Sequence, residues 1–453
     1  MKHTEALLKA EKFQQKMEKI AQNDYWRPQY HIAAPANWIN DPNGFCFYKG
    51  EYHLFYQYHP YSSQWGPMHW GHVASKDLAD WEHRPIALAP TDEYDKDGCF
   101  SGSAIENDGK LYLLYTGHVD LDNSNGGNDR IETQCLAVSD DGKHFEKVEN
   151  NPVIKALPEN LNIRTEHFRD PKVWKHGDWY YTVVGVQTKE ESGQVVVYKS
   201  QDLINWEFLN IMATSSVKEN LGFMWECPNF AEVNGHEALI LSPQGVKSEG
   251  NKFLNVHQSG YFLGKMDYQT GIFHRDSKFD LLDYGFDFYA PQIMQDEKNN
   301  RCLMIAWLDM WESNMPEQEN HWAGMMSIPR VLKVENNMIY SKPADELSKL
   351  HKSKVHHEQI IKEATSFDDV NGDCYQLDID FDLEKAQGFI LKLRVSNTEE
   401  TVISYDKDTK IFKLNRDKSG CGVKGEREVS IEPVREKMNL QIFSDRSSLE
   451  IFI

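Results

Sequence analysis

The sequence predicts an all-β fold: a five-bladed β-propeller followed by a C-terminal β-sandwich, with a short helix at the N-terminus. Two observations lead to this prediction. Short apolar strands recur through the middle of the chain at intervals of 58 to 68 residues, and a second set of alternating strands follows near the C-terminus. We therefore divide the chain into an N-terminal helical segment (1–27), a propeller (28–345), a linker (346–357) and a sandwich (358–453).

Composition narrows the class of protein before any motif is considered. The 453 residues include 12 Trp, 20 Tyr and 22 Phe, which is too aromatic for a disordered chain. The 70 acidic residues exceed the 49 basic ones and give a net charge of −21, so nucleic acid and anionic membranes are not expected as partners. The seven cysteines form no C-x-x-C pair, and the apolar runs are strand-sized. We expect a cytoplasmic protein without a signal peptide, a disulfide framework or a structural zinc site.

The N-terminal helix is expected over residues 5–22. Phe13, Met17 and Ile20 recur at helical spacing among charged residues and define one apolar face. We expect this face to dock on the main body of the protein. A contact between two copies of the chain is the alternative, and the oligomeric state stays open.

The repeat in the middle of the chain has two markers. An Asp followed four residues later by an aromatic residue predicts a hairpin bend whose ring packs back on the sheet. It occurs at Asp77, Asp141 and Asp202, with a degraded copy at Asp267. The other marker is a short apolar strand preceded by a turn, expected at 52–57, 111–116, 179–184, 237–242 and 302–307. Five such units predict five propeller blades; an irregular β-sandwich with accidental periodicity is the alternative.

Acidic residues stand at matching places near the start of three repeats. Asp41, Asp170 and Glu226 are each followed by a proline within two residues. Because the inner strands of a propeller surround one axis, we expect these acids to meet in a single pocket. Clustered carboxyl groups repel and lose hydration, so one can hold its proton near neutral pH while a neighbour stays ionised. That combination suits acid–base work on a glycosidic bond.

Other interpretations of these residues are weaker. A single Asp is often only a turn or cap residue. A divalent metal would also accept oxygen ligands, but the aromatic residues nearby suit a sugar ring better, so we expect neither a metal nor a cofactor. His69 and His72 have the spacing of a ligand pair and are interpreted as strand or core residues. The aromatic residues that could stack on a sugar are Trp38, Trp65, Trp70, Phe100, Trp225 and Tyr289.

Around these residues the sequence resembles glycoside hydrolase family 32, the β-fructofuranosidases. The family includes invertases, fructanases and sucrose-6-phosphate hydrolases. The resemblance covers nearly the whole chain and is carried by an ordered set of motifs: Trp38-Ile-Asn-Asp41-Pro-Asn-Gly44, Phe55-Tyr-Gln57-Tyr-His-Pro60, Trp65-Gly-Pro-Met-His-Trp-Gly71, Phe100-Ser-Gly-Ser103, Phe168-Arg-Asp170-Pro171, Trp225-Glu226-Cys227-Pro228 and Asp287-Phe-Tyr-Ala-Pro291.

This resemblance implies a retaining double displacement and a role for each acid. Asp41 would be the nucleophile that attacks the anomeric carbon of fructose. Glu226 would be the general acid and then the base, and Asp170 would stabilise the transition state with Arg169 beside it. The positions that the resemblance assigns to substrate binding are Trp38, Ile39, Asn40, Gln57, Trp65, Phe100, Ser101, Arg169 and Tyr289.

The expected substrate is a small sugar with a terminal β-D-fructofuranoside bond. The context of residues 222–228 favours the bacterial sucrose-6-phosphate hydrolases within the family, with sucrose as a second substrate. The net charge of −21 would repel a sugar phosphate at long range, although salt screens this beyond about 8–10 Å. An inulin-type fructan hydrolase and a non-catalytic carbohydrate-binding propeller are the alternatives.

The C-terminal segment returns to alternating strands, which are typical of a small β-sandwich. The expected strands are 374–381, 388–395, 401–405, 410–415, 439–443 and 448–452. The last of these lies directly before Ile453, where the sequence ends. Compared with the family, the sandwich looks short by a few strands, so we expect an exposed sheet edge.

Overall fold

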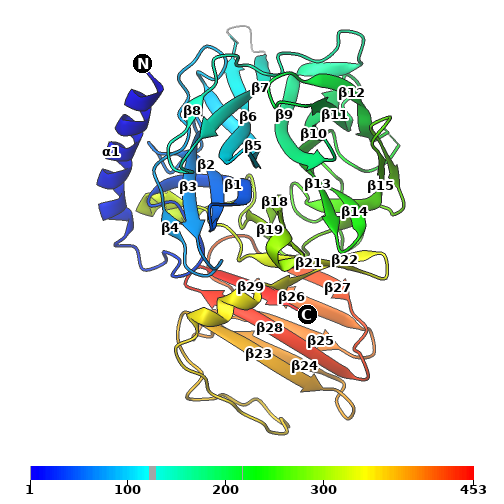
Figure 1. Ribbon diagram of the computed structural model, residues 1–453. Helices are drawn as coiled ribbons and strands as arrows, with labels where there is room; N and C mark the ends of the chain where they lie inside the picture. The colour runs from blue at the N-terminus through cyan, green and yellow to red at the C-terminus, as the bar shows by residue number, and fades with distance from the viewer. Residues whose placement is uncertain (1, 122–128, 217) are drawn as a thin grey trace.

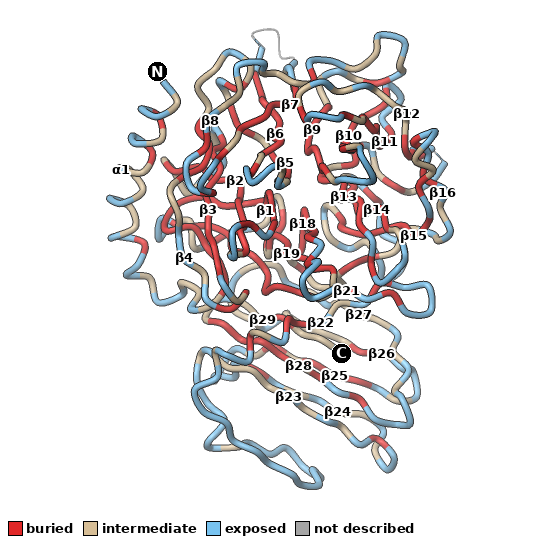
Figure 2. The backbone as a smooth tube through the Cα atoms, in the orientation of Figure 1, coloured by how far each residue is buried: buried red, intermediate tan, exposed pale blue. Residues whose placement is uncertain are grey.

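A computed structural model describes residues 2–121, 129–216 and 218–453. Five sheets are arranged around a common axis, and two further sheets form a sandwich below them in the view of Figure 1. The predicted all-β fold, with a propeller and a sandwich, is therefore confirmed. Buried residues concentrate in the propeller strands, whereas the outer surface of the sandwich is largely exposed or intermediate (Figure 2).

Each propeller blade is an antiparallel sheet whose first strand lies nearest the axis. The first blade contains β1 (Asn37–Tyr48), β2 (Glu51–His59), β3 (His69–Ser75) and β4 (Glu82–His83), and the second contains β5 (Gly98–Asn107), β6 (Lys110–Asp120), β7 (Arg130–Ser139) and β8 (Glu146–Lys147). The third contains β9 (Ile163–His176), β10 (Trp179–Thr188), β11 (Gly193–Ser200) and β12 (Glu207–Thr214). The fourth contains β13 (Met224–Val233), β14 (His236–Gln244), β15 (Gly260–Asp267), β16 (Ile272–Arg275) and the short β17 (Asp280–Leu281). The fifth contains β18 (Tyr289–Asp296), β19 (Arg301–Trp307), β21 (Arg330–Glu335) and β22 (Met338–Pro343).

The ring closes through contacts between neighbouring inner strands. β1 contacts β5, β5 contacts β9, β9 contacts β13, β13 contacts β18, and β18 returns to β1. A short strand, β20 (Trp322–Ala323), leaves the fifth blade and pairs in parallel with β1 of the first. This pairing joins late and early parts of the chain, so the backbone itself closes the propeller. Every strand predicted from the repeat is the second strand of its blade.

The predicted Asp bends connect the third and fourth strands of a blade. Asp77 accepts hydrogen bonds from the backbone N–H groups of Ala79 and Asp80, and Asp202 does the same at the equivalent place in the third blade. The degraded copy at Asp267 accepts from two N–H groups in the turn before β16. A short-range side-chain bond therefore sets each bend, which is why the sequence revealed it.

The N-terminal helix α1 spans His3–Ala21 and lies against the outside of the propeller (Figure 1). Phe13 meets Tyr61 edge to face, with ring centroids 5.4 Å apart, and Met17 packs against a buried cluster that includes Trp322. The predicted docking of this helix is confirmed for these two residues. The assignment of Ile20 to the same face is wrong, because its side chain is 47% exposed. Within the described residues, no helix is long and apolar enough to cross a membrane.

The C-terminal unit consists of two facing sheets. Its strands are β23 (Tyr375–Asp382), β24 (Gly388–Leu393), β25 (Thr401–Asp406), β26 (Ile411–Asn415), β27 (Glu426–Ser430), β28 (Lys437–Asp445) and β29 (Ser448–Phe452). One sheet has the order β23-β28-β29 and the other β24-β25-β26-β27. β27 is not predicted from the sequence, because its side chains are largely charged; it forms an edge of its sheet. Three short 3-10 turns occur at Glu297–Asn299 (η1), Pro316–Asn320 (η2) and Asp345–Leu350 (η3).

A buried polar network fastens the sandwich to the propeller. The ring of His31 contacts Asp445 through Nδ1 at 2.9 Å and Glu450 through Nε2 at 3.0 Å. Glu450 also accepts a hydrogen bond from the backbone N–H of Ile328 at 2.7 Å and pairs with the Arg330 guanidinium. All of these charged side chains are buried. Burial opposes the charged form of the imidazole, but the two carboxylates prevail and raise the pKa of His31 to about 9.

Candidate active site

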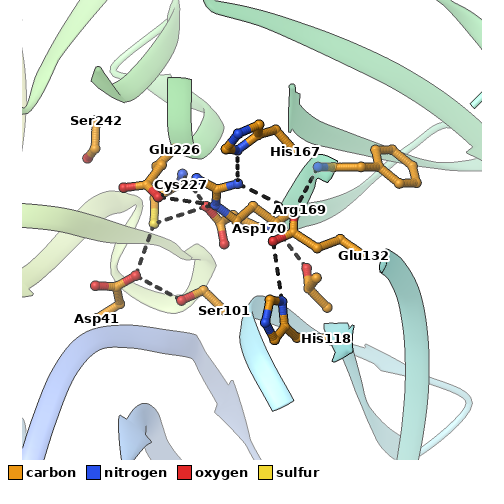
Figure 3. A network of polar contacts seen from close by, with 12 residues as sticks. Asp41, Ser101, His118, Glu132, His167, Arg169, Asp170, Glu226, Cys227 and Ser242 are labelled. Carbon is orange, nitrogen blue, oxygen red and sulfur yellow. Dashed lines mark hydrogen bonds and ion pairs between the residues drawn. The ribbon is translucent and has the colours of Figure 1, made fainter. Parts of the chain in front are cut away.

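Three inner strands bring the predicted acids together. Asp41 lies on β1, Asp170 on β9 and Glu226 on β13, and Figure 3 shows their carboxyl groups converging around Cys227. Asp41 and Asp170 are 8% and 6% exposed, and the Glu226 side chain is 14% exposed. The ring of contacts between inner strands thus brings together the three acids at the matching repeat positions, as predicted.

Every inner strand contains a β-bulge that changes the direction of its side chains near the acids. Each bulge inserts one extra residue opposite the second strand of the blade, which locally turns the strand and redirects its side chains. Asp170, Cys227 and Ala290 adopt positive φ angles of 65°, 46° and 51°, a conformation that costs non-glycine residues about 1–3 kcal/mol each. Each precedes a proline, which has no N–H group to leave unpaired in the bulge. The bulges lie at 39–42, 100–102, 169–172, 226–229 and 289–292.

Asp41 is held by three side-chain donors. Ser101 Oγ donates to Asp41 Oδ2 at 2.8 Å, and Asn40 Nδ2 donates to Oδ1 at 3.1 Å. The Cys227 thiol lies 3.4 Å from the same Oδ2. Burial and the nearby Glu226 charge raise the pKa of Asp41 to about 6, while the three donors act in the opposite direction. At neutral pH the carboxyl is therefore largely ionised and oriented.

Asp170 is hydrogen-bonded to the blades on both sides of its own. The Cys227 N–H donates to Asp170 Oδ2 at 2.9 Å, and the Asp170 N–H donates to Thr116 Oγ1 at 3.0 Å. Burial raises the pKa of Asp170. The Arg169 guanidinium opposes this shift, and the charges of Glu226 and Asp41 add to it. The sequence motif contains Cys227, but its contacts with two acids were not foreseen.

Both carboxylate oxygens of Glu226 accept hydrogen bonds from side chains. Arg169 donates to Glu226 Oε1 through Nε at 3.1 Å and through Nη2 at 2.7 Å. The Tyr289 hydroxyl donates to Oε2 at 2.6 Å. Both partners were predicted as substrate-binding residues, and the structure shows in addition that they orient this carboxylate.

A further acid behind Arg169 was missed by the sequence analysis. Glu132 on β7 is buried, lies 3.4 Å from Arg169 Nη1, and accepts the Phe168 N–H at 2.8 Å. Burial alone would raise the pKa of Glu132, but the Arg169 guanidinium and His118 lower it to about 2. The network in Figure 3 therefore places a fixed negative charge under the arginine. The sequence signal was weak: one acidic residue in an otherwise buried strand.

The predicted aromatic residues divide into three groups. Trp65 is 49% exposed and meets Phe100 edge to face, with centroids 6.2 Å apart, so its ring keeps an accessible surface. Trp38 is buried and donates through Nε1 to Asn40 Oδ1 at 2.7 Å, which positions the residue next to Asp41. The interpretation of Trp70 and Trp225 as sugar platforms is wrong, because both are fully buried within hydrophobic clusters of the blades.

Two other positions predicted to bind substrate, Ile39 and Gln57, are buried. Ile39 is 1% exposed and packs in the hydrophobic core of the first blade, so the structure does not bring its side chain to the acids. Gln57 is buried on β2 and donates to the Cys99 carbonyl at 3.1 Å. His69 and His72 are buried strand residues, as predicted. Across the described parts of the chain, no group of three or more His, Cys, Asp or Glu side chains could hold a metal ion.

Comparison with known proteins identifies the class of protein that this fold and site define. Residues 31–343 match the family model for the N-terminal domain of glycosyl hydrolases family 32, and residues 346–453 match the model for its C-terminal domain. The chain belongs to this family. It is a glycoside hydrolase of the β-fructofuranosidase type.

Individual relatives cover almost the whole chain. A sucrose-6-phosphate hydrolase of Zymomonas mobilis is 42% identical over 99% of this chain and 88% of the relative. The solved structure of a Bombyx mori β-fructofuranosidase mutant in complex with sucrose is 37% identical, with a TM-score of 0.84 over 99% of this chain and 90% of that one. A sucrose-6-phosphate hydrolase structure from Lactobacillus gasseri is 30% identical, with a TM-score of 0.85 over 97% and 88% of the two chains.

Proposed function

We propose that this protein hydrolyses the terminal β-D-fructofuranoside bond of sucrose-6-phosphate and of sucrose, with retention of configuration at the anomeric carbon. One observation carries the proposal: an ionisable, well-oriented Asp41 and a firmly held Glu226 occupy one pocket together with Asp170. Retaining glycosidases need such a pair of carboxyl groups, one as nucleophile and one as acid–base catalyst. The substrates named for the relatives above support the choice of sugar.

In the first step, Asp41 attacks the anomeric carbon of the fructosyl unit. The bond from that carbon to the glucosyl oxygen breaks, and its electron pair leaves with the oxygen, which takes a proton from Glu226. Asp41 suits this role because its carboxyl is largely ionised at pH 7 and its two oxygens are aligned by Asn40 and Ser101. The product of this step is a covalent fructosyl-enzyme.

In the second step, Glu226 removes a proton from water as the water attacks the same carbon. The bond to Asp41 breaks, its carboxylate is restored, and fructose leaves. Asp170 faces the same pocket and is assigned to the fructosyl hydroxyl groups, where hydrogen bonds that strengthen in the transition state lower the barrier. Arg169 and Tyr289 hold Glu226 in position through both steps.

The Asp41→Ala variant tests the assignment of the nucleophile. We expect the variant to lose hydrolysis of sucrose by at least about 10³-fold, because no other carboxyl can form the covalent intermediate. Circular dichroism and thermal melting should show a folded protein. Asp80→Ala is the matched control, since Asp80 is an exposed acid of the same blade, and it should keep normal turnover. Ordinary turnover by Asp41→Ala would exclude Asp41 as the nucleophile.

Substrate preference is tested by parallel kinetics on sucrose, sucrose-6-phosphate and inulin. We expect the two disaccharides to be cleaved with kcat/KM values well above that of inulin. A higher kcat/KM for inulin would replace the proposed function with a fructan hydrolase. The cytoplasmic location expected from the sequence remains a separate prediction.

A further inference from the structure

The catalytic pocket does not by itself explain how a phosphorylated sugar would be recognised. The chain carries a net charge of −21, so a phosphate group needs local cations that are not already neutralised by acids. In sucrose-6-phosphate the phosphate is on the C6 arm of the glucosyl ring. Only the ring oxygen separates the carbon that bears this arm from the carbon that bears the glycosidic oxygen. The phosphate must therefore lie within one sugar's width of Glu226.

Arg130 is a cation close to the Arg169 cluster, because its charge lowers the pKa of both Glu132 and His167. It is the first residue of β7 and lies opposite Asp120 of β6 in the sheet register. Asp120 uses its Oδ1 for His118, at 3.1 Å. Among the described residues, the buried Nε of the Arg130 guanidinium has no hydrogen-bond partner. A buried guanidinium donor without an acceptor is costly, so an unfilled acceptor position is indicated.

His167 offers a second donor beside Arg130. Its Nδ1 lies 2.9 Å from Arg169 Nη1, which can only donate, so Nδ1 is the acceptor and the neutral ring carries its proton on Nε2. Burial and the Arg169 charge lower the pKa of His167 to about 4, and the Arg130 charge contributes in the same direction. The imidazole is therefore neutral at pH 7. Within the described structure its Nε2–H has no acceptor.

Arg169 connects these two donors to the catalytic acid. The same guanidinium that contacts His167 holds Glu226 Oε1 at 2.7 Å, and Figure 3 shows His167, Arg169 and Glu226 in one continuous network. The charge of Arg169 is already balanced by Glu132 and Glu226. Arg130 adds a second cation to this cluster, and among the described residues the Nε of its guanidinium has no hydrogen-bond partner.

We propose that Arg130 and the Nε2–H of His167 form a phosphate subsite that binds the 6-phosphate of the glucosyl group. This inference rests on the proposed function and names the residues that would give it its preference for the phosphorylated sugar. A planar guanidinium can donate two parallel hydrogen bonds to phosphate oxygens, which makes arginine well suited to such a subsite.

The test compares sucrose-6-phosphate with sucrose in the Arg130→Ala variant. A charge-assisted hydrogen bond is typically worth 1.5–3 kcal/mol, so we expect kcat/KM for sucrose-6-phosphate to fall about 10- to 100-fold. The value for sucrose should fall far less, because sucrose has no group for this subsite. Arg130→Lys should recover part of the preference. Arg164→Ala is the matched control: Arg164 is on β9, the strand of His167, and its guanidinium is already paired with Glu191 at 3.1 Å. The ratio of the two kcat/KM values should not change.

A binding measurement keeps this test independent of turnover. Glucose-6-phosphate and glucose are titrated by calorimetry into the Asp41→Ala protein, with and without Arg130→Ala. We expect tighter binding of the phosphate ester, and loss of most of that advantage when Arg130 is removed. Equal losses for both sugars, or an unchanged ratio of kcat/KM values, would overturn the subsite. If the wild-type protein cleaves neither disaccharide, the proposed function fails, while the calorimetric result still decides on the subsite.

Discussion

The hydrogen bond from Ser101 to Asp41 makes a quantitative prediction about the pH dependence of catalysis. Its length is 2.8 Å, the shortest of the three side-chain contacts that hold this carboxyl. Asp41 must be ionised to attack, so activity is present above its pKa and is lost as the pH falls through that value. With a pKa of about 6, the acid limb of kcat/KM should lie near pH 6.

The Ser101→Ala variant removes this donor and should move the acid limb upward. A hydrogen bond to a charged group is worth about 1.5–3 kcal/mol, and 1.36 kcal/mol corresponds to one pKa unit. We therefore expect the pKa of Asp41 to rise by about one to two units, to about 7–8. At pH 6, where half of the wild-type Asp41 is ionised, kcat/KM should then fall about 5- to 50-fold from this effect alone.

The assay is the initial rate of sucrose hydrolysis at low substrate concentration from pH 4.5 to 9. kcat/KM is the appropriate quantity, because it reports the titration of the free enzyme. Ser103→Ala is the control: Ser103 is a buried serine on the same strand, and its hydroxyl donates to the Pro171 carbonyl at 2.7 Å rather than to Asp41. An acid limb that stays in place, or that moves to lower pH, would refute the role assigned to the Ser101 hydroxyl.

Three further predictions concern stability and metal dependence. The ion pairs with Asp445 and Glu450 raise the pKa of His31 from 6.5 to about 9. This shift corresponds to roughly 3 kcal/mol of unfolding free energy. That contribution is fully present below pH 6.5 and is lost as the pH rises through 9. The difference in unfolding free energy between the wild type and His31→Gln should shrink by about that amount from pH 6 to 10; a constant difference would show that His31 is neutral in the fold. Gly102→Ala should yield little folded protein on expression, because its Cβ would lie 2.0 Å from the Leu114 carbonyl oxygen, and a normal melting temperature would contradict this. Incubation with a chelator should leave the hydrolysis rate unchanged, and a loss restored by a divalent cation would reveal a metal requirement.

Features determined by short-range interactions could be predicted from the sequence. The Asp77 and Asp202 bends depend on side-chain bonds to N–H groups two and three residues later, so they are visible in the chain itself. The five second strands are apolar because they lie within blades, and their spacing indicates the repeat. The repeat then implies one axis, so the sequence alone predicts that Asp41, Asp170 and Glu226 lie in one pocket.

The direction of each side chain depended on the tertiary structure. Ile39 and Asn40 are neighbours in one motif, yet one packs in the core and the other holds Asp41, since strand register and a bulge decide which side faces the axis. Trp70 and Trp225 turned into their blades for the same reason. Glu132 has no motif and gains its importance only because Arg169 of the next blade packs over it. Local chemistry along the chain thus determined where the strands, the bends and the acids stand, whereas contacts between blades decided which side chains meet, because those contacts join residues that are remote in the sequence.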